Sequence, residues 1–279
     1  MNGMTRSAAQ GRGGTTGFTI IEVLVVLGII AVLMAILLPV MEKVRHRGYI
    51  QACASNLRSI GQAMAVYANE NHGHYPRTTY VPDAPVSYGS GVASPDPFAS
   101  GAISPNDVST AVFLLLRSQK LPYAIFICPY NDVFVYEIDR GDPQSRSNFT
   151  DYRKNFGYSI ANPYPDDAAV RAGYKWTATM PPDFALLADK NPGIDTDNTT
   201  DDATAALPGA PEQIMSKARS ENHEKDGQNV LYPDGHVAWQ LNVTCGVSQD
   251  NIFTTRGNQL DASPVDKNDS VLLPTDDPK

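Results

Sequence analysis

The sequence contains few of the residues, and none of the motifs, that usually indicate catalysis. Only three cysteines and five histidines occur in 279 residues, and we find no G-x-S-x-G, H-E-x-x-H, Walker or dinucleotide-binding pattern. Basic residues are also scarce, because 22 lysines and arginines are opposed by 30 acidic residues, which leaves a net charge of -8. An acidic chain is a poor match for a phosphate backbone. We therefore expect a protein that is not an enzyme and that does not bind nucleic acid.

Long helical stretches are missing after residue 75. Glycine and proline number 21 each, and they crowd into residues 76–105 and 181–211, where they favour turns and ordered loops. With 42% hydrophobic residues, the chain can nevertheless form one sizeable folded domain. We expect this globular head to cover residues 76–260 and a flexible tail to follow at residues 261–279.

A long apolar run is present near the N-terminus. Residues 18–41 read FTIIEVLVVLGIIAVLMAILLPVM and contain a single charge. As a helix at about 1.5 Å per residue they span roughly 36 Å, which is enough to cross a bilayer. The apolar part of a secretory signal peptide is shorter, roughly 7 to 15 residues, and is followed by small residues. Residues 1–17 contain two arginines and no acid, which is typical of a cytoplasmic leader, but basic residues also follow the run, so charge alone does not settle the orientation.

The pattern becomes amphipathic after residue 41. Six apolar residues recur at steps of three and four and would form one stripe on a helix: Ile50, Cys53, Leu57, Ile60, Met64 and Tyr67. Residues 71–76, NHGHYP, are then predicted to end the helix. We expect one helix over residues 18–70, with residues 42–75 as an amphipathic stalk. Two helices broken near Gly48 are the alternative.

The head is expected to combine a small sheet with short helices. Residues 77–108 are predicted to be irregular, and residues 109–120 are predicted to form a helix capped by Ser109. Short β-branched or aromatic runs are predicted to be antiparallel strands at residues 123–127, 133–138, 184–188, 230–232 and 237–241. The predicted fold class is α+β: a long N-terminal helix, half transmembrane and half amphipathic, packed on a small antiparallel sheet with long loops.

One acidic residue interrupts the apolar run. A carboxylate is unfavourable by ~3 kcal/mol near the centre of a membrane span, so Glu22 needs a compensating partner. Gly17, Phe18 and Glu22, followed by unbroken apolar helix, resemble the class III signal of type IV prepilins and type II secretion pseudopilins. An uncleaved signal anchor with a chance glutamate is the alternative.

This resemblance implies a processing route. A prepilin peptidase would cleave between Gly17 and Phe18, removing the leader of residues 1–17, and would methylate the amine of Phe18. Glu22 would then pair with the terminal amine of a neighbouring subunit during assembly. Pro39 falls at the twenty-second mature position, where members of the family commonly carry a proline that loosens the helix.

A tight turn is predicted farther along the chain, because Asp234 and Gly235 lie between two apolar runs. Together with His223 and His236, this segment of residues 223–240 resembles the processing-associated H-x9-DG motif of prepilin-like proteins from planctomycete-type bacteria. In this sequence ten residues, rather than nine, separate His223 from Asp234. The segments that contain Cys53-Ala54-Ser55-Asn56 and Ile127-Cys128-Pro129 also resemble recurring parts of that family.

The three cysteines allow one disulfide if the head lies in an oxidising compartment. We favour Cys53 with Cys128, because the first lies on the apolar stripe and the second ends an apolar run. Two buried free cysteines are the alternative, and Cys245 could replace either partner.

Two sets of residues are candidate metal ligands. Asp189, His223, Asp234 and His236 would suit a divalent metal if they converge, although hairpin geometry explains the last two equally well. Asp195, Asp197 and Asp201 form a calcium-type oxygen cluster that lacks the glycine and terminal glutamate of an EF-hand, so a solvated acidic loop is the stronger interpretation. We expect no cofactor, with calcium as the one candidate.

The resemblance implies a structural subunit of a pilus-like or type II secretion-related assembly. Its partners would be the prepilin peptidase, other pilin or pseudopilin subunits, the assembly machinery and the membrane. It would cross the bacterial inner membrane once, with a cytoplasmic N-terminus and a periplasmic or extracellular head. The alternatives are a membrane-tethered binding module, which uses the signal only for processing, and an anchored enzyme.

Overall fold

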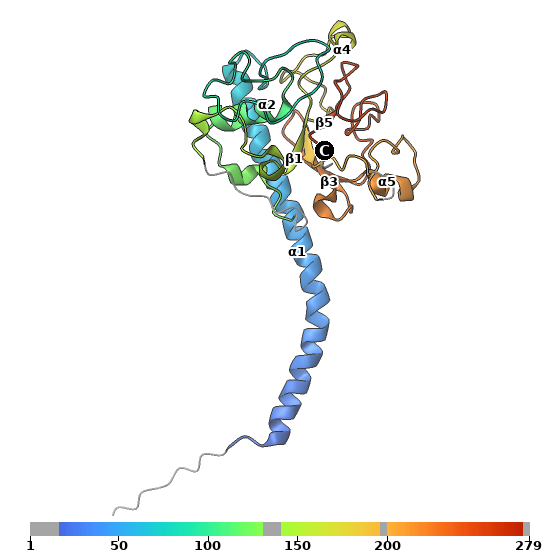
Figure 1. Cartoon of the computed structure of the whole chain (residues 1–279). Coiled ribbons are helices and arrows are strands. Elements are labelled where there is room, and N and C mark those ends of the chain that lie inside the picture. Colours follow the sequence, from blue (N-terminus) through green and yellow to red (C-terminus); the bar gives the residue numbers. More distant parts are fainter. Residues whose placement is uncertain (1–16, 131–140, 196–199, 276–279) are drawn as a thin grey trace, which may run out of the picture. The chain divides into compact units, whose positions relative to one another are not determined.

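The computed structural model describes residues 17–130, 141–195 and 200–275 (Figure 1). The chain divides into two compact units, residues 1–45 and residues 46–279, and each is described by itself. The second unit contains one hydrophobic core, a small sheet and several short helices joined by long loops. The architecture is α+β, as predicted from the sequence.

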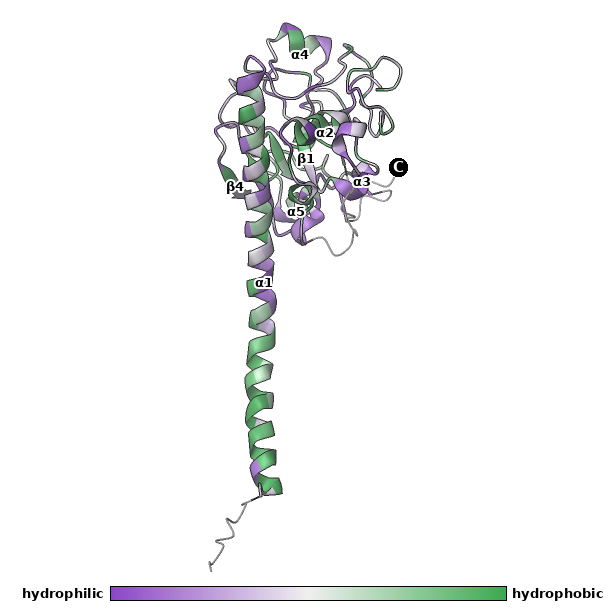
Figure 2. Cartoon of the chain, turned by 90° about the vertical axis from the view of Figure 1, so that its left-hand side faces the viewer, coloured by the Kyte–Doolittle hydropathy of each residue, from purple (hydrophilic) through white to green (hydrophobic). Residues whose placement is uncertain are grey.

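Helix α1 runs from Ile20 to Glu70 without interruption. This confirms the single long helix predicted from the sequence, and no break occurs near Gly48. All side chains from residue 17 to residue 45 are exposed, and those of residues 20–41 are almost uniformly apolar (Figure 2). Among the described residues, α1 is the one helix long and apolar enough to cross a membrane. Pro39 lies inside this part of the helix, where it removes one backbone hydrogen bond.

The later part of α1 belongs to the second unit and packs into its core. The predicted stripe is confirmed, since Cys53, Leu57, Ile60 and Met64 are all fully buried. The helix approaches the sheet closely at Gly61, where an added Cβ would lie 2.9 Å from the end of the Leu231 side chain. Polar residues on the opposite side give this part of the ribbon its mixed colours in Figure 2.

The sheet has five antiparallel strands in the order β4-β3-β2-β1-β5. Their bounds are Tyr158–Ala161 for β1, Leu187–Asp189 for β2, Gln228–Leu231 for β3, Val237–Gln240 for β4 and Leu272–Leu273 for β5. Strands β3 and β4 form the predicted hairpin, in which Leu231 pairs with Val237. Strand β2 lies in the middle of the sheet, with Asp189 opposite Tyr158 of β1.

Two predictions about the head need correction, and a third cannot be compared with the structure. Residues 123–127 were predicted to be a strand, but Tyr123–Phe126 form the 3-10 helix η1. This helix starts after Pro122, whose carbonyl accepts a hydrogen bond from the Ile125 amide. The tail predicted to be flexible instead supplies β5 up to Leu273, and its Val271, Leu272 and Leu273 are fully buried. The predicted strand at residues 133–138 lies outside the described residues.

The predicted helix at residues 109–120 is α2, Val108–Ser118, and it is capped by Asp107 rather than Ser109. The Thr110 amide donates to Asp107 Oδ1, and the Ser109 hydroxyl donates to the same carboxylate. A carboxylate at this position also interacts favourably with the positive end of the helix dipole. The remaining short helices are η2 Pro143–Ser145, α3 Tyr152–Asn155, α4 Asp167–Arg171, α5 Glu212–Ala218 and η3 Glu221–His223.

Candidate functional site

The N-terminal motif lies at the start of α1. The Thr19 amide and hydroxyl donate to Glu22 Oε2 at 2.7 and 2.8 Å, and the Glu22 amide lies 3.3 Å from the Thr19 hydroxyl. This reciprocal arrangement is a capping box, which satisfies backbone donors at the helix start. Phe18 is 89% exposed and Gly17 has open space around it. The structure therefore gives Glu22 a local role in starting the helix, and its predicted role in assembly stays a prediction.

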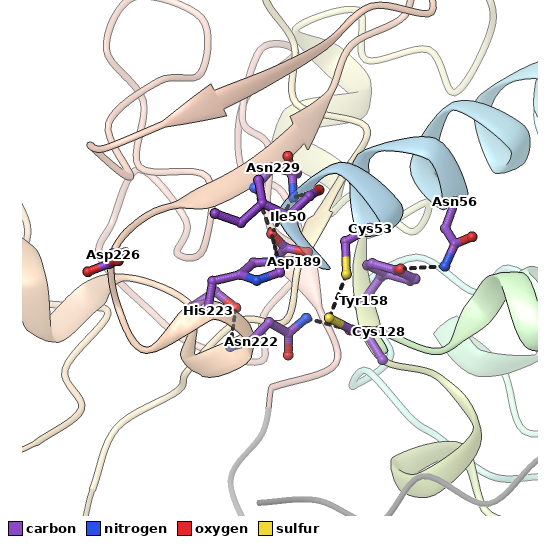
Figure 3. Close-up of polar contacts among 12 residues, drawn as sticks. Ile50, Cys53, Asn56, Cys128, Tyr158, Asp189, Asn222, His223, Asp226 and Asn229 are labelled. Carbon is purple, nitrogen blue, oxygen red and sulfur yellow. Dashed lines mark hydrogen bonds and ion pairs between the residues drawn. The ribbon is translucent and has the colours of Figure 1, made fainter. Parts of the chain in front are cut away.

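Four chemically reactive side chains meet inside the head. Cys53 of α1, Cys128 just after η1, Asp189 at the end of β2 and His223 at the end of η3 are all buried. One potential ligand atom from each residue lies within 4.8 Å of all the others. Figure 3 shows the four side chains pointing toward one another from separate elements. We call these four residues the buried cluster.

Glycine is needed to bring the Cys128 segment to the sheet. The Gly157 amide donates to the Phe126 carbonyl at 2.7 Å, and a Cβ on Gly157 would lie 2.8 Å from the Cys128 backbone nitrogen. The Gly157 carbonyl in turn accepts a hydrogen bond from the side chain of Asn222, the neighbour of His223. One close backbone approach thus positions both Cys128 and the η3 turn.

Asp189 is held by the adjacent strand. The amide and the side-chain nitrogen of Asn229 donate to Asp189 Oδ2 at 2.7 and 3.1 Å. The same Asn229 side chain reaches the Ile50 carbonyl of α1 at 3.3 Å. Asn229 therefore joins the carboxylate of β2 to the helix that carries Cys53, as the close-up shows (Figure 3).

The electrostatics of the cluster are set by one buried ion pair. His223 Nε2 lies 3.3 Å from Asp189 Oδ2, and both side chains are completely buried. Burial alone would lower the pKa of His223, but the Asp189 carboxylate and the Cys128 sulfur together outweigh it and raise the pKa to about 10. Burial likewise opposes ionisation of Cys128, but contacts with Cys53 and His223 lower its pKa to about 7. Its neighbour Cys53 has a raised pKa, because of the contact with Cys128 and because of burial.

Several polar atoms of the cluster make no hydrogen bond. Neither ring nitrogen of His223 makes a hydrogen bond, although Nε2 forms the ion pair with Asp189, and Asp189 Oδ1 also lacks a hydrogen-bond partner. Aromatic rings surround the imidazole, with ring centres at 5.5 Å for Tyr130, 5.5 Å for Trp239 and 6.2 Å for His46. Buried polar atoms are normally paired, so these three atoms need a chemical explanation.

The structure brings the predicted cysteine pair together. The Sγ atoms of Cys53 and Cys128 are 2.6 Å apart, with no disulfide bond between them. Cys245 is not a member of the cluster, and its carbonyl accepts a bond from the Tyr232 hydroxyl. The choice of partners therefore agrees with the geometry, while the disulfide itself stays a prediction.

The first predicted ligand set is divided by the fold. Asp189 and His223 are buried together, whereas Asp234 and His236 lie in the exposed turn between β3 and β4. There the His236 amide donates to Asp234 Oδ1 at 3.0 Å, and Gly235 has a φ of 87°. Turn geometry accounts for Asp234 and His236.

The predicted calcium-type cluster uses its carboxylates within its own loop. Asp195 Oδ2 accepts bonds from the amides of Thr200 and Asp201 and from the Thr200 hydroxyl. Asp201 forms an ion pair with Lys225 at 2.5 Å. Asp197 lies outside the described residues. Among the residues that the structure describes, this loop is not one of the groups in which three or more ligand atoms converge.

The buried cluster has the chemistry of a ligand set. Two sulfurs, a carboxylate and an imidazole converge, and all four side chains are shielded from solvent. Comparison with known proteins identifies no relative, since no family model, no curated protein and no solved structure matches the chain.

Proposed function

We propose that this chain is a membrane-anchored structural subunit of the pilin or pseudopilin kind. It is cleaved between Gly17 and Phe18, methylated at the Phe18 amine and assembled with other subunits into a pilus-like or type II secretion-related structure. The observation that carries the proposal is the position of Glu22, the fifth residue of the mature chain, at the start of a helix whose apolar side chains are exposed on every side up to residue 45.

The exposed surface of α1 argues for two environments. Side chains such as Ile29, Leu33 and Leu37 are each more than half exposed, and water is an unfavourable surrounding for them at roughly 25 cal/mol per Å² of apolar area. Before assembly, a lipid bilayer would surround these apolar side chains and keep them out of water. In an assembled structure, the same residues of neighbouring subunits would cover one another.

Glu22 gives the assembly its register. In the folded chain its carboxylate contacts only Thr19 among the described residues, and that contact offers hydrogen bonds but no opposite charge. Cleavage before Phe18 creates a new positive amine at the same end of the helix. A carboxylate in apolar surroundings is stabilised when a cation approaches it, so the amine of an adjacent subunit is a fitting partner.

The proposal places the chain in the bacterial inner membrane as a single-pass protein. The N-terminus would face the cytoplasm, where the prepilin peptidase acts, and the head would face the periplasm or the exterior. The apolar length of α1 supports the crossing itself. The orientation follows from the proposed processing route.

Replacement of Glu22 tests the assembly function. We expect Glu22→Ala to leave cleavage intact but to abolish crosslinks between the α1 helices of adjacent subunits, measured with a photo-crosslinking residue at position 26 in the native membrane. Glu42→Ala, which removes an exposed acid at a different level of the same helix, is the matched control and should retain the crosslinks. If the unsubstituted chain itself gives no crosslinks, the result favours a tethered monomer and refutes assembly.

A further inference from the structure

We propose that Cys53, Cys128, Asp189 and His223 form a structural site for a divalent metal ion of borderline softness, with Zn²⁺ as the best match. The site lies entirely within residues 46–275. It does not depend on how the N-terminus is processed, so the two proposals stand or fall separately.

The donor set and its geometry agree with a tetrahedral zinc site. Two cysteine sulfurs, one imidazole nitrogen and one carboxylate oxygen are ligands that Zn²⁺ commonly takes in proteins. They come from four different elements yet converge within 4.8 Å. All four residues are at most 2% exposed, as expected of a closed structural site in which protein atoms supply every ligand.

The unpartnered atoms are the second, independent observation. His223 is completely buried and neither of its ring nitrogens makes a hydrogen bond, and Asp189 Oδ1 is in the same condition. A buried polar atom without a partner is unfavourable by roughly 1 to 3 kcal/mol. A metal ion in the middle of the cluster would accept one imidazole lone pair and one lone pair of Asp189 Oδ1.

The surroundings are arranged as a supporting shell. Asn229 holds Asp189 through Oδ2 with two hydrogen bonds, which fixes the carboxylate and leaves Oδ1 available. The rings of Tyr130 and Trp239 enclose the imidazole and limit its rotation. Ligands held in a fixed orientation and shielded from solvent favour metal binding.

A disulfide between Cys53 and Cys128 is the competing explanation. The sulfurs are 2.6 Å apart, whereas a disulfide requires about 2.05 Å and two thiolates on one zinc ion require about 3.7 Å, so either state needs a small movement. The distance does not decide between them. His223 and Asp189 do, because a neutral disulfide would use only the sulfurs and would leave the imidazole and Asp189 Oδ1 without a hydrogen bond.

Metal binding would connect the elements that build the head. It would link α1, the segment after η1, the central strand β2 and the η3 turn through one point. Binding would release to solvent the protons of the two thiols and the imidazolium proton of the ligating His223 nitrogen, so the ion would be held by two thiolates, a carboxylate and a neutral imidazole. The ion would thus fasten the amphipathic half of α1 to the sheet.

Cobalt is the probe for this site. The full chain is purified in detergent with a reductant that does not bind metals, freed of metal with a chelator, and titrated with Co²⁺ and then Zn²⁺. We expect one equivalent of Co²⁺ to give the near-ultraviolet band of thiolate-to-cobalt charge transfer and the visible bands of tetrahedral Co²⁺. Zn²⁺ should displace it and should raise the melting temperature of the unsubstituted chain.

Variants separate the four ligands from other sites. We expect Cys128→Ser and His223→Gln each to weaken Co²⁺ binding by at least about tenfold, while Cys245→Ser, which lies outside the cluster, keeps one equivalent and the full spectrum. Because a ligand variant can fail to fold, the unsubstituted chain decides the matter. A reduced chain with native circular dichroism that takes up no Co²⁺ would overturn the proposal. The proposal would also be overturned if the chain isolated from cells contains a Cys53–Cys128 disulfide, detected as a mass 2 Da below that of the dithiol form.

Discussion

His223 Nε2 lies 3.3 Å from Asp189 Oδ2, and neither side chain has any solvent-exposed surface. Two opposite charges buried at this distance stabilise each other, and each becomes an uncompensated buried charge when the other is removed. The pair joins the η3 turn to the central strand of the sheet. Substitution of either residue should therefore have a large effect on the stability of the head.

Breaking this pair should destabilise the head strongly. We expect Asp189→Asn or His223→Gln to lower the free energy of unfolding by about 3 to 5 kcal/mol, measured by urea denaturation in the presence of a chelator. The double variant should lose less than the sum of the two, because the two residues interact directly. His236→Gln, in the exposed β3-β4 turn, is the control and should change stability by less than about 0.5 kcal/mol. Additive losses would show that the pair is not coupled.

The close approach at Gly157 leads to a second prediction. A Cβ at this position would lie 2.8 Å from the backbone nitrogen of Cys128, which cannot move as a flexible side chain can. We expect Gly157→Ala to destabilise the chain by about 1 to 3 kcal/mol and to weaken Co²⁺ binding, since Cys128 would be displaced. Gly48→Ala is the control, because nothing lies within 4 Å of that position and alanine favours a helix by up to about 1 kcal/mol. Equal stability of the two variants would contradict this account.

The stability of the head should fall as pH rises from about 4 to about 7. Burial raises the pKa of Asp250 to about 7, and the nearby Asp269 carboxylate adds to this, although the amide of Ser270 opposes it. The folded state then holds a proton that the unfolded chain releases near pH 4, so raising the pH favours unfolding. At about 1.4 kcal/mol per pKa unit, a rise from 3.8 to about 7 corresponds to an effect on the order of 4 kcal/mol.

Asp250→Asn tests that pH dependence directly. The variant keeps an oxygen that can accept from Ser270 but carries no titrating group. We expect the difference in unfolding free energy between the variant and the unsubstituted chain to grow in the variant's favour as pH rises from 4 to 7, measured by urea denaturation at several pH values. A difference that is constant over this range would contradict the raised pKa of Asp250.

The sequence predicted the helices better than it predicted the sheet. Helix α1 was predictable because its apolar run and its stripe, from Ile50 to Tyr67, are local patterns of sufficient length. Strand β1 was missed because all four of its residues are buried on both faces and show no alternation. Strand β5 was missed because two residues are too few to form a pattern, and the pairing of Leu273 with Ile160 depends on the tertiary fold.

The buried cluster was only partly accessible from the sequence. Cys53 and Cys128 were predicted as a pair, and Asp189 and His223 were named together as candidate ligands. What joins the two pairs is the strand order, which places β2 beside β3 and brings residues that are far apart in the sequence to one point. No local spacing encodes that meeting. Asp234 and His236 were predicted to converge with them as ligands, but they lie in the exposed β3-β4 turn.

The mass of the mature N-terminus tests the central claim most directly. The chain is isolated from membranes of a cell with an active prepilin peptidase, and its N-terminal peptide is sequenced by mass spectrometry. The account predicts a chain that starts at N-methylated Phe18, and a chain that keeps residues 1–17 when the peptidase is inactivated. An N-terminus other than methylated Phe18 in the active cells, or one that does not change without the peptidase, would contradict it.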